Sequence, residues 1–216
     1  MRYNGRMSIE GLKFAESGLN KEDWKLLKSL SNPQKIQDFL NSIPFNFERD
    51  GETHNSVSQS LKAKRIHCFE GALIAAAALW IQGRKPLLLD LVAIRPDFDH
   101  VVVLFMEDGQ WGALSKTNHS VLRYRDPIYK SVRELVMSYF HEYFLKNGKK
   151  TLRKYSKPFD LSKEGTYWIA TEENLAGLAH KLDKSTHLEI LSLDQSRSLR
   201  RAEDIETKAS ELTEYP

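Results

Sequence analysis

One cysteine and one histidine are the side chains of this chain best suited to covalent chemistry. Cys68 stands at the start of a long apolar segment that favours an α-helix. We expect its thiol where free backbone amides and the helix dipole stabilise a thiolate, which is the form of cysteine that attacks carbonyl groups. His100 opens an apolar, β-favouring segment. If that strand packs across the helix start, its imidazole can act as general base and then as acid to the leaving group.

A third group is needed to hold the imidazole in one tautomer. We expect it near the end of the strand that follows the one begun by His100, at Ser115 or Asn118. Asn118 can accept a hydrogen bond from an imidazole N–H, and the hydroxyl of Ser115 can do so more weakly. Asp97 and Asp99 also flank His100. Charged residues before a strand more often form a solvated loop.

The elements that must position these residues follow from the apolar periodicity. Residues 68–81 are apolar on nearly every face and are followed by Gly83, which predicts a buried central helix. Shorter helices are expected at residues 20–30 and 33–40, and a loop with one helical turn at residues 44–64.

The segments after the central helix favour strands. Residues 86–94, 100–106 and 110–115 are rich in β-favouring side chains, and a turn signal at 107–109 joins the last two into a hairpin. Further strands are expected at residues 121–124, 167–170 and 187–191, and further helices at residues 129–145 and 172–182. The pattern predicts an α+β fold in which a central buried helix packs on an antiparallel sheet, with added C-terminal helices and strands.

Composition is that of an ordinary globular protein. Of the 216 residues, 41% are hydrophobic and 28% are charged, so one domain with peripheral additions is expected. The formal net charge of +3 is small and spread along the chain, which gives little support to a polyanion partner. Residues 116–119 and 123–125 carry basic side chains that could meet phosphates, but a solvated turn explains them as well. Nucleic-acid binding is therefore only weakly supported.

The compartment is expected to be the cytoplasm. The longest apolar stretch, residues 72–81, is about half of the roughly 20 residues that a membrane-spanning helix needs, so we expect no membrane segment. Residues 1–13 lack an apolar run followed by small residues, which argues against a secretory signal. One cysteine cannot form an intramolecular disulfide, which fits a reducing compartment.

No metal and no cofactor are expected. The side chains His67, Cys68, His100, His119 and His141 form no close chelating pattern. His67 adjoins Cys68, but neighbours on a helix point apart, so we expect no part for it in the site. Neither the substrate nor the oligomeric state follows from the sequence.

The order of these features resembles a known family. Behind Cys68 comes Gly71-Ala-Leu-Ile-Ala-Ala-Ala-Ala-Leu, then His100-Val-Val-Val-Leu, then Asp108-Gly-Gln-Trp-Gly-Ala-Leu114. Upstream lie Pro33-Gln-Lys-Ile-Gln-Asp-Phe-Leu40 and Ile43-Pro-Phe45. Across residues 33–118 this order is similar to the transglutaminase-like superfamily of papain-fold cysteine enzymes.

The resemblance implies a transglutaminase-like core and acyl transfer through a thioester. The reaction would be amide or peptide hydrolysis, or transglutaminase-type transfer, on a protein or peptide substrate. Cys68 would be the nucleophile and the donor of one oxyanion-hole amide, and His100 would be the acid and base. Members carry an aspartate where this chain has Ser115, and they often carry an aromatic residue where it has Val102. Either Ser115 or Asn118 would therefore have to orient the imidazole.

The missing aspartate leaves a second reading of the resemblance open. A catalytically inactive transglutaminase-like scaffold that binds a peptide or nucleic-acid partner would also lack that carboxylate. On either reading, residues 1–150 form the core with its N-terminal helices and residues 151–192 a C-terminal α/β extension of the same domain. Residues 193–216 are expected to be a charged, loosely docked tail.

Overall fold

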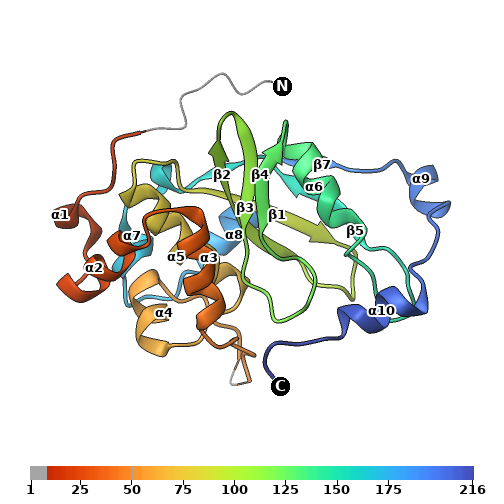
Figure 1. Cartoon of the computed structure of the whole chain (residues 1–216), viewed down its shortest axis with the longest axis horizontal. Coiled ribbons are helices and arrows are strands. Elements are labelled where there is room, and N and C mark those ends of the chain that lie inside the picture. Colours follow the sequence, from red (N-terminus) through yellow and green to blue (C-terminus); the bar gives the residue numbers. More distant parts are fainter. Residues whose placement is uncertain (1–8, 50) are drawn as a thin grey trace.

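An antiparallel sheet with apolar clusters on both of its faces is the framework of the protein (Figure 1). The structure is a computed structural model that describes residues 9–49 and 51–216. The first eight residues of segment 1–13, for which we expected no secretory signal, lie outside that range. In the described part of the chain the sheet has seven strands in the order β4-β3-β2-β1-β5-β7, and β6 also pairs with β1.

The strands are β1 (Leu87–Ala93), β2 (His100–Glu107), β3 (Gln110–Leu114), β4 (Arg125–Tyr129), β5 (Leu152–Ser156), β6 (Phe159–Asp160) and β7 (His187–Glu189). The helices are α1 (Phe14–Ser17), α2 (Lys21–Ser29), α3 (Pro33–Ser42), α4 (Val57–Ala63), α5 (Cys68–Ile81), α6 (Val132–Phe140), α7 (Tyr167–Ala170), α8 (Ala176–Asp183), α9 (Leu193–Arg197) and α10 (Asp204–Ser210), with a 3-10 turn η1 (Leu161–Glu164).

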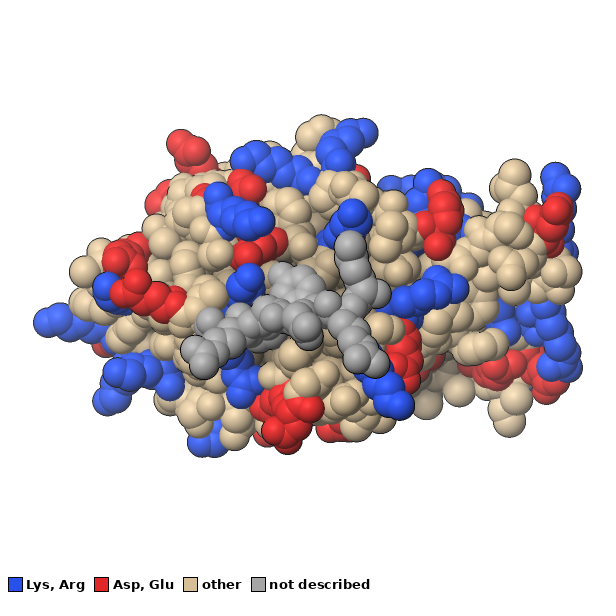
Figure 2. Space-filling view, turned by 90° about the horizontal axis from the view of Figure 1, so that it is seen from above, with Lys and Arg blue, Asp and Glu red and all other residues tan. Residues whose placement is uncertain are grey.

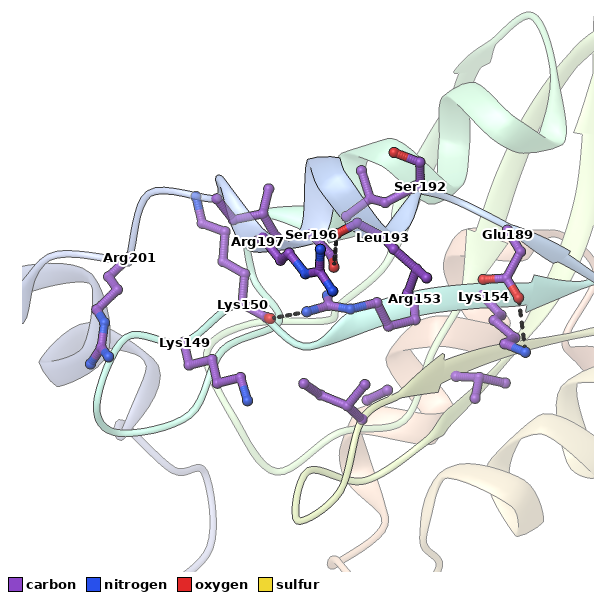
Figure 3. Close-up of a pocket in the computed structure, with 15 residues that line it drawn as sticks. Lys149, Lys150, Arg153, Lys154, Glu189, Ser192, Leu193, Ser196, Arg197 and Arg201 are labelled. Carbon is purple, nitrogen blue, oxygen red and sulfur yellow. Dashed lines mark hydrogen bonds and ion pairs between the residues drawn. The ribbon is translucent and has the colours of Figure 1, made fainter.

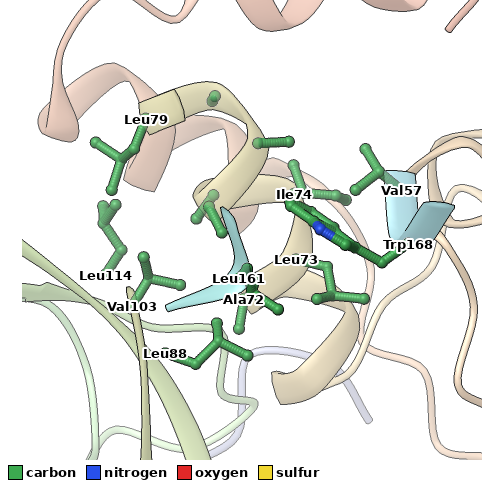
Figure 4. Close-up of a cluster of buried hydrophobic side chains, with 14 of the residues drawn as sticks. Val57, Ala72, Leu73, Ile74, Leu79, Leu88, Val103, Leu114, Leu161 and Trp168 are labelled. Carbon is green, nitrogen blue, oxygen red and sulfur yellow. The ribbon is translucent and has the colours of Figure 1, made fainter. Parts of the chain in front are cut away.

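Helix α5 is the centre of the larger apolar cluster, as the sequence predicts. Every residue from Phe69 to Leu79 is buried, and alanines on the helix let its neighbours approach closely. Val57 of α4 and Trp168 of α7 pack on one side of it, while Leu88 and Val103 of the sheet pack on the other (Figure 4). This burial fixes the position of the helix N-terminus relative to β2.

The opposite face of the sheet carries the second cluster. Strand residues alternate between the two faces, so Leu89 and Val102 lie in this cluster whereas Leu88 and Val103 lie in the first. Tyr139 of α6 is fully buried in the second cluster. The register of β1 and β2 places Leu91 opposite His100, at the end of the sheet where the candidate site lies.

Most predicted elements are confirmed. Helices α2, α3 and α5 begin at Asn20, Asn32 and His67 caps, and β1, β2 and β3 lie where strands were expected. Strand β1 pairs beside the β2–β3 hairpin. Gly83 has a positive φ of 75° just after α5, which an L side chain rarely adopts.

Two predicted elements are wrong, and a third is shorter than expected. Residues 167–170 form helix α7 instead of a strand, because Trp168 and Ile169 both turn inward onto the α5 cluster. The strand expected at residues 121–124 lies at β4 instead, since Leu122 has a left-handed backbone (φ 59°) that interrupts an extended chain. The helix expected at residues 129–145 is only Val132–Phe140, because Tyr129 pairs with Trp111 in the sheet.

The C-terminal segment crosses the molecule from the far end of the sheet back to the region below β3 and α4 (Figure 1). Its helix α10 exposes Ile205, and the residues after it pair with the loop that follows β3: His119 bridges Thr213, and Ser120 N–H donates to Leu212 O at 3.0 Å. Backbone hydrogen bonds therefore dock this tail. Among the described helices none combines the length and the apolar character needed to cross a bilayer.

Candidate active site

Cys68 is the first residue of α5, and the residue before it caps the helix. His67 has extended backbone angles (φ −100°, ψ −170°), its Nδ1 lies 3.3 Å from the backbone nitrogen of Phe69, and its own backbone N–H donates to the carboxylate of Glu70 at 3.1 Å. This capping box uses two backbone donors of the first turn. The half-buried thiol of Cys68 thus lies at the positive end of a long, buried helix, as predicted.

The structure brings Ser115, and not Asn118, to His100. The imidazole Nε2 of His100 lies 2.7 Å from the hydroxyl oxygen of Ser115. The same hydroxyl donates to the carbonyl oxygen of Leu122 at 2.5 Å, so its oxygen accepts from the imidazole Nε2–H. This arrangement leaves Nδ1 as the ring nitrogen of His100 that can take up or give a proton.

Ser115 is held through its backbone as well as its side chain. Gln37 of α3 accepts from Ser115 N–H at 3.0 Å and donates to Ser115 O at 2.8 Å, and both residues are buried. On the far side, Leu122 N–H donates to Glu142 at 2.7 Å, and Glu142 pairs with Arg125 at 2.5 Å. The orientation of His100 therefore depends on a chain of polar contacts that ends at an ion pair.

The thiol of Cys68 is strongly acidic in this setting. Burial alone would raise the pKa of Cys68, but hydrogen bonds from His100 and His67, together with the positive charge of the two imidazoles, lower it from 9.0 to about 5. At neutral pH the sulfur is consequently a thiolate. A lowered thiol pKa of this kind is typical of nucleophilic cysteines.

His67 belongs to the site, and the expectation that it points away from Cys68 is wrong. The rule that neighbours diverge applies inside a helix, whereas His67 is the extended cap before it. Its Nε2 donates to Thr53 O at 2.8 Å. Burial would lower the pKa of His67, but the thiolate of Cys68, the carboxylate of Glu70 and the Thr53 carbonyl raise it to about 9.

Glu70 ties the loop of residues 44–64 to the start of α5. Its carboxylate is fully buried and accepts from the hydroxyl of Thr53 at 2.9 Å and from the amide side chain of Asn55 at 2.5 Å. Asn46 also donates to it, at 3.4 Å. A buried carboxylate needs such a set of donors. The network holds one wall of the site against the residues around Cys68.

The remaining sequence candidates contact other groups. Asn118 donates to Tyr215 O at 3.0 Å and accepts from Tyr215 N–H at 2.9 Å, so its amide docks the C-terminal tail. Asp97 accepts from the hydroxyl of Thr151, and Asp99 accepts from Ala93 N–H at 2.8 Å. These three side chains stabilise the chain around the site instead of orienting His100.

The basic residues after β3 are also engaged. Lys116 is buried, and its ammonium donates to the carbonyls of Leu40 and Ile43 at the end of α3, so burial lowers its pKa to about 8. Arg125 pairs with Glu142. A Cβ on Gly71 would lie 2.7 Å from Lys116 Cβ, so only glycine lets α5 approach this loop so closely.

The arrangement can carry out nucleophilic attack on an acyl group. A thiolate, an imidazole with an oriented Nε2–H, and first-turn amides that can stabilise an oxyanion lie at one helix end. A comparison of the chain with models of protein families finds no match, and a comparison with curated proteins finds none either.

Proposed function

We propose that the protein is a cysteine-dependent acyl-transfer enzyme in which Cys68 is the nucleophile and His100 is the general acid and base. The observation that carries this proposal is the acidic thiol of Cys68 between two imidazoles, one of which is oriented by Ser115. A merely structural cysteine would need neither an imidazole partner nor a second polar group behind it.

The chemistry proceeds in two balanced steps. The thiolate of Cys68 attacks the carbonyl carbon of an amide, the imidazolium of His100 gives its proton to the leaving nitrogen, and the C–N bond breaks to leave a thioester. Water or an amine then gives a proton to His100 and attacks the thioester, and the C–S bond breaks to restore the thiolate. The backbone amide of Cys68 supplies one oxyanion donor.

The order of elements supports a transglutaminase-like core for this reaction. A cysteine begins a buried helix, a histidine begins β2, and the next strand ends beside that histidine. We propose that Ser115 takes the place of the aspartate found in that superfamily. The substrate class we expect is a protein or peptide amide, and the proposed steps use no metal or cofactor.

Acylation by an activated ester tests the proposal. With p-nitrophenyl acetate we expect one acetyl group on Cys68, release of p-nitrophenol, and no acetylation of the Cys68→Ala variant. His100→Ala should slow acylation at pH 6 by about tenfold or more, because loss of this imidazole raises the pKa of the thiol and lowers the thiolate fraction. The control is His180→Ala on α8, which removes an exposed imidazole away from these contacts and should leave the rate unchanged.

The competing hypothesis is a binding scaffold without turnover, and the serine in place of a carboxylate is the feature that favours it. Such a scaffold would show an acylation rate that does not depend on His100. It would also keep the acetyl group once attached, because no base would activate water for the second step. Rapid loss of the acetyl group from wild type, slowed in His100→Ala, supports the enzyme.

A further inference from the structure

A cleft lies between α9, the end of β1 and the segment leading into β5, and it is lined by basic side chains (Figure 3). Its volume is about 1080 Å³. The basic residues that line it come from both walls: Lys149, Lys150, Arg153, Lys154, Arg197 and Arg201. Glu189 is the one carboxylate among the lining residues.

The lining of the cleft carries an excess of positive charge, although Arg197 also pairs with Asp194 of α9 at 3.5 Å. Six basic and one acidic lining side chain give the cleft a formal charge of +5, which exceeds the +3 of the whole chain. On the face shown in Figure 2 the two signs are interspersed. Glu189 pairs with Lys154 at 2.9 Å, whereas Arg153 donates to the carbonyl oxygens of Leu152 and Lys150, which leave its charge uncompensated.

Part of the cleft lining is aliphatic. Ile94, Leu191 and Leu193 are among these residues, and none of the lining residues is aromatic. Single-stranded nucleic acid is bound on aromatic side chains that stack with bases, which this cleft lacks. A ligand that carries several negative charges with aliphatic side chains between them matches both the basic and the aliphatic residues of the lining.

The cleft lies at the same end of β1 as His100. Its wall at residues 92–94 continues β1 directly beyond Leu91, which lies opposite His100 in the sheet. Ala93 N–H donates at 2.8 Å to Asp99, the residue before His100. A peptide segment held in the cleft would thus lie at the end of the sheet that carries His100.

We propose that this basic cleft binds an acidic peptide segment of the protein substrate, in which aspartate or glutamate residues flank aliphatic ones. That the bound peptide belongs to a substrate rests on the acyl-transfer function proposed above. Binding itself needs no turnover. It is therefore measured on the full chain carrying Cys68→Ala.

The probe is a fluorescent peptide in which glutamates alternate with leucines, and its control has glutamine at every glutamate. We expect the glutamate peptide to bind at least about tenfold more tightly, and to weaken between about 50 and about 200 mM salt, because the attraction is screened. The triple variant Lys149→Gln, Arg153→Gln and Arg197→Gln should lose about tenfold or more in affinity.

A charge-matched variant separates the cleft from general electrostatics. Replacement of the exposed Lys21, Lys25 and Lys28 of α2 by glutamine removes the same charge elsewhere, and should change the affinity by less than about twofold. If the Arg153 substitution unfolds the chain, the pair Lys149→Glu and Arg197→Glu replaces it. That pair should reject the glutamate peptide and accept a lysine–leucine peptide.

The proposal is overturned if the two peptides bind alike, or if the cleft and α2 variants weaken binding equally. It is also overturned if an oligothymidylate displaces the glutamate peptide from the cleft at lower concentration, which would assign the cleft to nucleic acid. If the peptide binds but Cys68 of the wild type is not acylated, the proposed enzymatic function is wrong and the peptide-binding cleft stands. If Cys68 is acylated but the peptide does not bind, the enzymatic function stands and the proposed cleft is wrong.

Discussion

The imidazole of His100 and the hydroxyl of Ser115 form a hydrogen bond of 2.7 Å in the interior of the protein. The hydroxyl donates its hydrogen bond to the carbonyl of Leu122, so it can only accept from the imidazole. In the proposed enzyme this serine takes the place of the carboxylate that orients the imidazole in many cysteine enzymes, without adding a negative charge. It fixes the tautomer, but it stabilises the imidazolium less than a carboxylate would.

Ser115→Ala should slow acylation of Cys68 by about tenfold or more, because a hydrogen bond to a charged partner contributes about 1.5–3 kcal/mol. The group acts through His100, so the effect should fall on kcat while KM for the ester stays near its wild-type value. The matched control is Ser29→Ala, which also removes a hydroxyl bound to a backbone carbonyl, that of Leu26 at 2.6 Å. Equal rates in the two variants would remove Ser115 from the mechanism.

The thiolate of Cys68 gives a pH profile that an ordinary thiol cannot give. Alkylation by iodoacetamide follows the thiolate fraction, so with a pKa of about 5 the rate should be level from about pH 6 to pH 8 and fall below pH 5. A thiol with the ordinary value of 9.0 loses about tenfold in rate for each pH unit over that range. A steep slope between pH 6 and pH 8 would contradict the assigned environment.

His67→Asn tests the second imidazole. Asparagine can still cap α5, so the helix should be retained while one positive neighbour of the thiolate is lost. We expect the midpoint of the alkylation profile to rise by about one pH unit or more, since a nearby opposite charge shifts a pKa by about that much. His180→Asn, which changes an exposed histidine, should leave the midpoint where it is. An unchanged midpoint in His67→Asn would show that His100 alone holds the thiolate.

Local patterns in the sequence predict the scaffold of the site. The run of alanines after Cys68 favours a buried helix, and the valines after His100 favour a strand. The positions of Cys68 and His100 at the starts of these elements therefore follow from their neighbours in the chain. The pattern His67-x-x-Glu70 is also local and resembles a capping box. It was the signal from which the position of His67 outside the helix could have been inferred.

Contacts between distant residues could not be predicted in this way. Gln37 and Ser115 are 78 residues apart, and their two hydrogen bonds depend on how α3 packs beside β3. Strand β5 was missed because Arg153 and Lys154 interrupt its apolar pattern. Strands β1 and β7 pair with β5 through backbone hydrogen bonds, and the order of side chains in the sequence does not indicate such pairing.

Glu70→Gln should destabilise the fold. The NH₂ group of the new side-chain amide would face the hydroxyl of Thr53 and the amide of Asn55, which are both donors, in a fully buried site. We expect this mismatch to lower the free energy of unfolding by about 2 kcal/mol. For a chain of this size that loss corresponds to a fall in Tm of roughly 4–8 °C. Glu16→Gln on the exposed face of α1 should leave Tm within about 1 °C, as surface substitutions usually do. A Tm of Glu70→Gln within that same range would show that the network contributes nothing to stability.

Asp90 in the centre of β1 makes the stability depend on pH. Burial raises the pKa of Asp90 to about 6, although His187, whose Nε2 lies 3.1 Å from the carboxylate, opposes the shift. A pKa that is higher in the folded state than in the unfolded chain favours folding while the group is protonated. The contribution is therefore complete below about pH 4 and is lost as the pH rises through about 6, by up to about 3 kcal/mol.

Asp90→Asn should abolish this dependence. An asparagine has no proton to lose in this range, and its amide can donate to the Nε2 of His187 while the Nδ1 of that ring donates to Ser185 O. Urea unfolding at pH 4, 5, 6 and 7 should show that the stability of Asp90→Asn relative to wild type increases with pH, mostly between pH 4 and pH 6. Asp38→Asn, which changes an exposed carboxylate on α3, should give a nearly constant difference. A constant difference for Asp90→Asn as well would mean that Asp90 is ionised in the folded protein over the whole range, with His187 charged beside it.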